Sequence, residues 1–238
     1  MPSLMIVSHG QPSDPAPAEA ALADLARAVA AHLPGWRVVS ATLAGPGALA
    51  AAVAAAGPGA VVHPLFMADG WFTARHLPDR LAQAGAQGAR LTAPLGLLPG
   101  LADLALARAA EAAAAQGWAA GDTTVLVAAH GSFRSEAPAR VARDLAARLV
   151  AGGLAAAQTA FIDQDPQIAA VAADLPARSL CLPFFAAGGG HVTDDLPRAL
   201  AQAGFVGPVL PPIGGDAQVP ALIAAAARDQ ADRALAAG

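Results

Sequence analysis

The sequence of 238 residues contains no lysine and a single cysteine, and its formal net charge is −4. All 14 basic residues are therefore arginine, which we attribute to coding bias. The surplus of negative charge argues against general nucleic-acid binding, because that function needs basic groups against phosphate. The lone Cys181 lies in the apolar run Leu180–Leu182, which predicts a buried free thiol and suits a reducing compartment.

Long apolar runs are also missing. Hydrophobic residues make up 55% of the chain. Yet glycine, proline or charge interrupts every run well short of the roughly 20 residues that a membrane-spanning helix needs. Near the start, strand-like Leu4–Val7 gives way at once to Ser8-His9-Gly10, with no basic segment ahead of an apolar one. We therefore expect a soluble, cytoplasmic protein without a signal peptide.

What the sequence does contain is an internal duplication. Pro64–Phe66 and Leu77–Gly85 return as Pro183–Phe185 and Leu196–Gly204, at a constant offset of 119 residues (Pro64 to Pro183). This period is far longer than the 20–50 residues of a solenoid repeat and marks a duplicated half-domain. We predict two domains, residues 1–120 and 121–238, with the boundary within 117–122.

Each copy alternates short apolar runs with helical patterns. In the second copy the runs Val125–Ala128, Thr159–Ile162 and Leu180–Phe185 predict buried strands. The first copy repeats this order, with strands near Leu4, Val38, Val61 and Leu91. The alternation predicts an α/β fold in which each half has a mainly parallel sheet of about four strands flanked by helices.

Metal-competent side chains follow three strands of the second copy. His130 follows the first strand, Asp163 ends the second, and His191 lies in the loop after the third. Ligands bind at the carboxyl ends of parallel strands, so these side chains should converge. Two imidazoles and a carboxylate suit a divalent first-row metal and leave positions open for a ligand or water.

Other residues near these loops leave alternatives open. Asp163 and Asp165 could exchange roles, but we expect Asp165 to cap a helix that Pro166 opens and Asp163 to face the site. Asp194 or Asp195 can cap the next helix, which has Pro197 in its first turn and Gly204 just past its end. The run 188–190 is all glycine, so a flat substrate could approach the backbone there.

Three segments of the second copy together resemble one known family. They are His130-Gly131-Ser132, then Ala160–Asp163 with Pro166, then Pro183–Phe185 through Gly190-His191 to Asp194–Pro197. Their order and residues resemble the sirohydrochlorin cobaltochelatase/ferrochelatase family, the class II tetrapyrrole chelatases. The match spans the second copy and, more loosely, the first, as in the two-domain members. The resemblance implies two tandem chelatase-like, flavodoxin-like domains.

The resemblance also implies an activity and its residues. The activity is insertion of Co²⁺ or Fe²⁺, with Ni²⁺ possible, into sirohydrochlorin or a related tetrapyrrole without ATP. The metal-site histidines of the family fall on His130 and His191, and its acidic residue, commonly Glu, falls on Asp163. Substrate contacts are expected from Ser132, Arg134, Gly189 and Gly190. No cofactor is expected beyond the substrate metal.

The implied partners are the tetrapyrrole and the metal, with neither nucleic acid nor membrane. A monomer is compatible with the internal duplication, which could take the place of a homodimer. The implied pathway is cobalamin or siroheme biosynthesis. The main alternative is a degenerate chelatase that binds metal or tetrapyrrole without catalysis.

The first copy has lost most of this set. His9 survives, but Asp163 aligns with Ala44 and His191 with Phe72. His76 takes the place of Asp195, and His63 lies in an apolar strand, where we expect a buried, hydrogen-bonded side chain. We predict one active site, in the second half. The first half would supply a wall through Trp71 and Phe72, with Arg75 or His9 as further contacts.

A histidine phosphatase also has a His-Gly after its first strand. Its nucleophilic histidine needs neighbouring arginines to cradle phosphate, whereas Ser8 and Ala129 precede the two histidines here. We do not favour that function on this ground.

Overall fold

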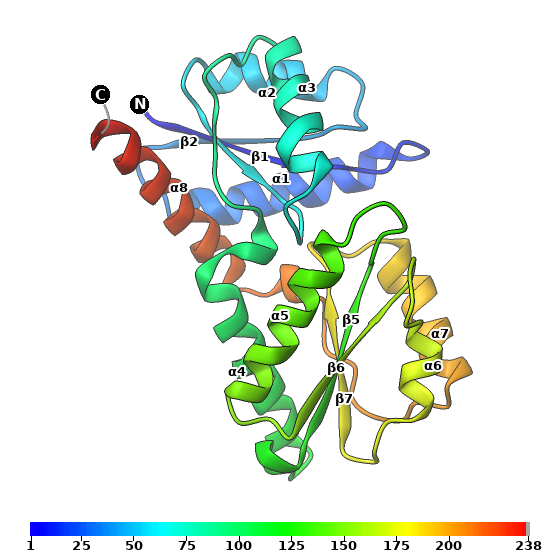
Figure 1. Ribbon diagram of the computed structural model, residues 1–238. Coiled ribbons are helices and arrows are strands. Elements are labelled where there is room, and N and C mark those ends of the chain that lie inside the picture. The colour runs from blue at the N-terminus through cyan, green and yellow to red at the C-terminus, as the bar shows by residue number, and fades with distance from the viewer. Residues whose placement is uncertain (237–238) are drawn as a thin grey trace. The chain divides into compact units, whose positions relative to one another are not determined.

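The computed structural model describes residues 1–236, which form two compact units (Figure 1). Unit 1 contains Met1–Leu98 and the chain from Ala217 onward, and unit 2 contains Pro99–Asp216. The units therefore do not coincide with the predicted domains 1–120 and 121–238. The predicted domains follow the order of the two similar copies along the chain. The compact units instead group the elements that pack around the same core.

The difference arises from the last helix of each copy. Helix α4 (Pro99–Ala115) packs against α5 and β7 of unit 2, although it belongs to the first copy. Helix α8 (Val219–Ala236) packs against α1 and β3 of unit 1, although it belongs to the second. Each copy thus contributes its final helix to the other unit.

Unit 1 is built on a parallel four-stranded sheet in the order β2-β1-β3-β4. The strands are β1 (Ser3–Ser8), β2 (Arg37–Thr42), β3 (Val61–Pro64) and β4 (Arg90–Leu91). Helices α2 (Ala48–Ala56) and α3 (Leu77–Gln83) pack on one face of this sheet. Helix α1 (Pro15–Ala31) packs on the sheet and against α8 (Figure 1).

Unit 2 has a parallel sheet in the order β6-β5-β7. Its strands are β5 (Thr124–Ala129), β6 (Ala156–Phe161) and β7 (Ser179–Phe184). Helices α6 (Ile168–Ala173) and α7 (Leu196–Gln202) share one core with the sheet, while α4 and α5 (Ala137–Ala151) pack on it together (Figure 1). An isolated parallel β-bridge between the backbones of Cys181 and Val209 takes the place of the fourth strand of unit 1. The predicted fold class is confirmed.

Strands β5 and β7 form because their side chains are buried on both faces. Every residue of β5 and β7 is buried, and the thiol of Cys181 is buried as predicted. Each fully buried Leu, Ile, Val or Phe side chain contributes about 1.5–3 kcal/mol relative to exposure. Within residues 1–236, no helix combines the length and apolar character needed to cross a membrane.

One predicted helix start needs correction, and a second helix starts where predicted but lacks the expected capping bond. Helix α6 begins at Ile168, not at Pro166, and its N-cap residue is Gln167. The carbonyl of Pro166 accepts a hydrogen bond from the Phe161 N–H (2.9 Å), so Pro166 extends the edge of the sheet and Asp165 caps no helix. Helix α7 has Pro197 in its first turn as predicted, but the carboxylate of Asp195 makes no capping hydrogen bond.

Backbone hydrogen bonds confirm how the two copies align. The N–H of Asp163 donates to the carbonyl of His130 (2.9 Å), and that of Ala44 donates to the carbonyl of His9 (3.0 Å). Asp163 and Ala44 thus occupy the same place after their second strands. Each copy also has a five-residue π-helical turn before its seven-residue helix: η1 (Phe72–His76) before α3, and η4 (His191–Asp195) before α7.

Candidate functional site

His130 is positioned by the glycine that follows it. Gly131 has φ +74°, and a Cβ there would lie 2.9 Å from the Cβ of Phe161 and 2.7 Å from the Cγ of Gln164. Only glycine combines this conformation with so close an approach. The chain therefore turns sharply after β5 and leaves the His130 side chain 44% exposed at the carboxyl edge of the sheet.

His191 is positioned by the π-helical turn η4. It is the first residue of this turn, and its carbonyl accepts a hydrogen bond from the N–H of Leu196, which begins α7. π-Helical turns are rare and often occur at functional sites. The His191 side chain is 47% exposed.

The two imidazoles lie in direct contact. Their Nε2 atoms are 3.0 Å apart, with the ring centroids separated by 4.4 Å and the planes 84° apart. Two nitrogens bound to one metal ion at about 2.0–2.1 Å, at angles from 90° to tetrahedral, lie roughly 2.9–3.4 Å apart. The spacing of the pair is therefore that of two ligands of a single ion.

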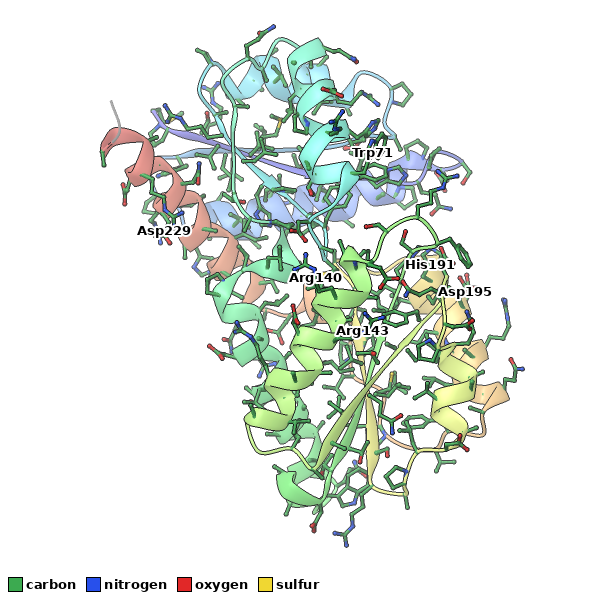
Figure 2. The ribbon with its side chains drawn as sticks, in the orientation of Figure 1. Trp71, Arg140, Arg143, His191, Asp195 and Asp229 are labelled. Atoms are coloured by element: carbon green, nitrogen blue, oxygen red, sulfur yellow. The ribbon has the colours of Figure 1, made fainter. Side chains whose placement is uncertain are left out.

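The protonation of each ring follows from its other nitrogen. Nδ1 of His191 lies 2.9 Å from Oδ2 of Asp195, an oxygen that can only accept when the carboxylate is ionised (Figure 2). Nδ1 of His130 faces the carbonyl of Gly131 at 3.1 Å and Oδ2 of Asp163 at 3.4 Å. These contacts favour the tautomer in which both Nδ1 atoms donate, and in that tautomer the two Nε2 lone pairs converge on one point. Two converging lone pairs of this kind are suited to hold one metal ion.

Asp163 is brought to His130, but on the side away from His191. Its side chain is 38% exposed and approaches Nδ1, not Nε2. Within the described residues, no three His, Cys, Asp or Glu side chains are arranged to hold one metal ion. Direct ligation of a metal by Asp163 thus stays a prediction.

The loop after Gly131 is held by hydrogen bonds. The N–H of Ser132 donates to Oε1 of Gln164 (2.8 Å), and the N–H of Arg134 donates to Oγ of Ser132 (3.1 Å). The Arg134 side chain is exposed, as is Phe133 at 82%. The structure therefore places Ser132 and Arg134 in the loop that begins beside His130. Their contact with a substrate remains a prediction.

Sequence reasoning missed the roles of Asp195 and Gln164. The sequence pattern indicates Asp195 only as a helix cap, although its i, i+4 spacing from His191 is a signal for contact along a helical turn. It also lies 3.5 Å from Nη1 of Arg198. Gln164 gave no signal, because its hydrogen bond to the Ser132 backbone depends on a turn visible only in the structure.

The corresponding place in unit 1 is aromatic. The ring of Phe72 meets His9 edge-on at 5.0 Å and His76 edge-on at 5.0 Å. Trp71 stacks on His76 at 4.9 Å, and Phe66 on Phe72 at 5.7 Å. Burial lowers the pKa of His9, and the charge of His76 lowers it further. His9 and His76 therefore flank a phenyl ring where unit 2 has a second imidazole.

His63 is buried and hydrogen-bonded, as the sequence predicts. Its Nδ1 lies 2.7 Å from Oγ1 of Thr92, while Nε2 has no hydrogen-bond partner within the described residues. Burial lowers the pKa of His63 to about 3, so the ring is neutral. It lies within strand β3 and is fully buried, so it does not face the strand-end loops.

Comparison with known proteins identifies the family. A family model described as CbiX matches residues 3–112 and again 124–230. This chain belongs to the CbiX family. The two matched segments correspond to the two copies of the internal duplication. The resemblance to sirohydrochlorin chelatases is confirmed. A search of curated proteins gave no match.

Solved structures agree with membership of the CbiX family. One is a CbiX described as the terminal enzyme for biosynthesis of siroheme in denitrifying bacteria. It is 53% identical, with a TM-score of 0.89, and the match covers 95% of this chain and 98% of that one. A multi-domain protein from Deinococcus radiodurans with structural similarity to chelatases is 25% identical, with a TM-score of 0.71, over 95% of this chain and 54% of that one.

A third structure shares the fold at low identity. It is the sirohydrochlorin chelatase SirB from Bacillus subtilis subspecies spizizenii in complex with cobalt. It is 17% identical, with a TM-score of 0.70, over 98% of this chain and 96% of that one. At this identity the likeness establishes the fold alone.

Proposed function

We propose that this CbiX-family protein inserts a divalent metal ion into sirohydrochlorin, or a related tetrapyrrole, without ATP. The observation that carries the proposal is the His130–His191 pair, whose Nε2 atoms lie 3.0 Å apart. Family membership and the 53% identity to an enzyme of siroheme biosynthesis support the substrate class.

The metal is a substrate, held transiently by His130 and His191. Imidazole suits Fe²⁺, Co²⁺ and Ni²⁺, and an incomplete protein shell leaves positions for the macrocycle nitrogens. We favour Co²⁺ or Fe²⁺, with Ni²⁺ as a further candidate. Thiolate ligation would oppose release, and the lone Cys181 is buried in the core. No resident cofactor is part of the proposal.

Insertion breaks two pyrrole N–H bonds, forms bonds from the metal to the macrocycle nitrogens and releases two protons. As the metal leaves, each Nε2 regains a free lone pair and can accept a proton. Asp195 and Asp163, beside the two Nδ1 atoms, stabilise the resulting imidazolium charge. The same carboxylates orient the rings while they hold the metal. We retain Asp163 as the acidic residue of the site.

The substrate carries carboxylates that arginine can bind in a bidentate manner. Arg134 is exposed in the hydrogen-bonded loop after His130, so its guanidinium can serve this role. We propose Ser132, Gly189 and Gly190 as further contacts. The pathway would be siroheme or cobalamin biosynthesis in the cytoplasm, with a monomeric enzyme.

An anaerobic absorbance assay of sirohydrochlorin with Co²⁺, Fe²⁺ or Ni²⁺ tests this function. We expect the wild type to accelerate metallation above the spontaneous rate, and His191→Ala to lose about 100-fold or more of that acceleration. His32→Ala is the matched control, because His32 lies exposed at the end of α1, outside the site.

Each failure has a distinct meaning. No acceleration with any metal by folded protein, together with tight metal retention, would favour the non-catalytic binding protein. Full activity in His191→Ala would place the metal site elsewhere in the chain.

A further inference from the structure

Residue 190 marks a second difference between the two units. Gly190 precedes the π-helical turn η4 with φ −50° and ψ −36°. Trp71 precedes the equivalent turn η1 with φ −54° and ψ −38°. The same backbone conformation therefore carries an indole in unit 1 and no side chain in unit 2.

In unit 1 the indole of Trp71 lies over the aromatic cluster. Trp71 stacks on His76 with centroids 4.9 Å apart and planes at 23°, and it meets Phe72 edge-on at 5.3 Å. The counterparts of Phe72 and His76 in unit 2 are His191 and Asp195. Because residue 190 is glycine, it places no side chain over the corresponding face beside His191.

The fold does not require glycine in this loop. A Cβ at Gly188 or Gly189 would meet nothing within 4 Å, and one at Gly190 would meet only Oδ2 of Asp194, at 3.7 Å. None of the three has a positive φ. At Gly214, by contrast, a Cβ would lie 2.2 Å from the carbonyl oxygen of Ala186. Glycine also costs backbone entropy, so its presence at 190 needs a reason other than packing.

We infer that Gly190 keeps the face beside His191 open for a planar ring of the tetrapyrrole, in the volume that the Trp71 indole fills in unit 1. Residue 190 would then be a steric determinant of macrocycle binding, acting separately from the metal ligands. A large side chain at 190 excludes the macrocycle and leaves the metal pair intact. This inference rests on the proposed function and adds where the substrate lies.

Gly190→Trp, which imports the unit 1 residue, tests the inference. Three measurements are needed: thermal unfolding, the visible absorption of Co²⁺ added alone, and the KM for sirohydrochlorin. We expect unchanged folding, Co²⁺ affinity within about twofold of the wild type, and a KM raised tenfold or more. Gly121→Trp is the matched control, since its Cβ would also be open, with only the Gly153 carbonyl at 4.0 Å, at the opposite edge of the sheet.

The outcomes separate the two proposals. A wild-type KM in folded Gly190→Trp overturns the inference while leaving the chelatase function standing. Loss of Co²⁺ binding by the folded variant also overturns it, because residue 190 would then act on the metal. If Gly190→Trp fails to fold, Gly190→Ala must still raise the KM. A wild type that neither binds nor metallates sirohydrochlorin refutes the proposed function, and this inference with it.

Discussion

The two units share a scaffold but place different side chains at the equivalent site. In unit 2 the sequence of contacts runs from His130 to His191 to Asp195, and in unit 1 from His9 to Phe72 to His76. Only the first residue is shared. Replacing an imidazole and a carboxylate with a phenyl ring and an imidazole exchanges a cation site for an aromatic cluster. A strand-end loop and a π-helical turn therefore fix where a site lies, and two side chains decide what it binds.

The largest effect should come from giving unit 2 the residues of unit 1. The double variant His191→Phe/Asp195→His should lose Co²⁺ binding and chelatase activity by more than about 100-fold, since a ligand and its supporting carboxylate are both removed. It should still fold, because η1 already has Phe and His at these positions. Equilibrium dialysis with Co²⁺ and circular dichroism check both statements. Retained Co²⁺ binding would mean that unit 2 does not hold the metal.

A smaller loss is expected when only the orientation of His191 is disturbed. Asp195→Asn keeps the size of the side chain but removes the charge beside Nδ1 of His191. We expect metal affinity and activity to fall about 10–100-fold. Asp194→Asn makes the same change at the neighbouring exposed position and should stay near wild type. Equal losses in both variants would point to a general charge effect.

The reverse exchange should create a site in unit 1. Phe72→His/His76→Asp would place an imidazole beside His9, whose ring centroid now lies 5.0 Å from that of Phe72. We expect Co²⁺ binding to rise from one to two ions per chain, the second weaker because Ala44 supplies no carboxylate. Isothermal titration calorimetry measures the stoichiometry. A stoichiometry of one would show that the scaffold of unit 1 no longer brings the two positions together.

The smallest expected effect is on how the free energy of unfolding depends on pH, through His63. His63 pairs with Ile6 in the sheet, and its counterpart Leu182 pairs with Val127. Its pKa is about 3 when folded, against an ordinary 6.5 when unfolded, so the unfolded chain binds the proton more readily and stability falls as pH drops below 6.5. From pH 7.5 to 5.0 this costs about 2 kcal/mol.

His63→Leu should remove that share of the acid sensitivity. Urea unfolding at pH 7.5 and pH 5.0 gives the free energy of unfolding at each pH, and the wild type should lose about 2 kcal/mol more than the variant between them. Thr92→Val, which removes the hydroxyl beside Nδ1, should leave the acid sensitivity in place. Identical losses in the wild type and His63→Leu would mean that this ring is not neutral in the fold.

Much of this could be predicted from the sequence because duplication supplies an internal reference. The offset between copies aligned His191 with Phe72 and Asp163 with Ala44, and strand ends predicted the meeting of His130 with His191. What could not be predicted depended on side-chain direction. Asp163 approaches the far nitrogen of His130, Asp165 caps no helix, and Asp195 contacts a ring instead of the backbone. The packing partners of α4 and α8 could not be predicted either, since a helical pattern of apolar residues does not indicate which element will cover it.

The exchange of final helices has a consequence for synthesis. Unit 2 is continuous in the chain, so every element it needs has been made once residue 216 is added. Unit 1 begins first but must wait for α8, which follows the whole of unit 2. On the ribosome, where domains usually mature in the order of their synthesis, the later unit would here complete its core before the earlier one. The elements that carry the metal pair are thus made before the last helix of unit 1.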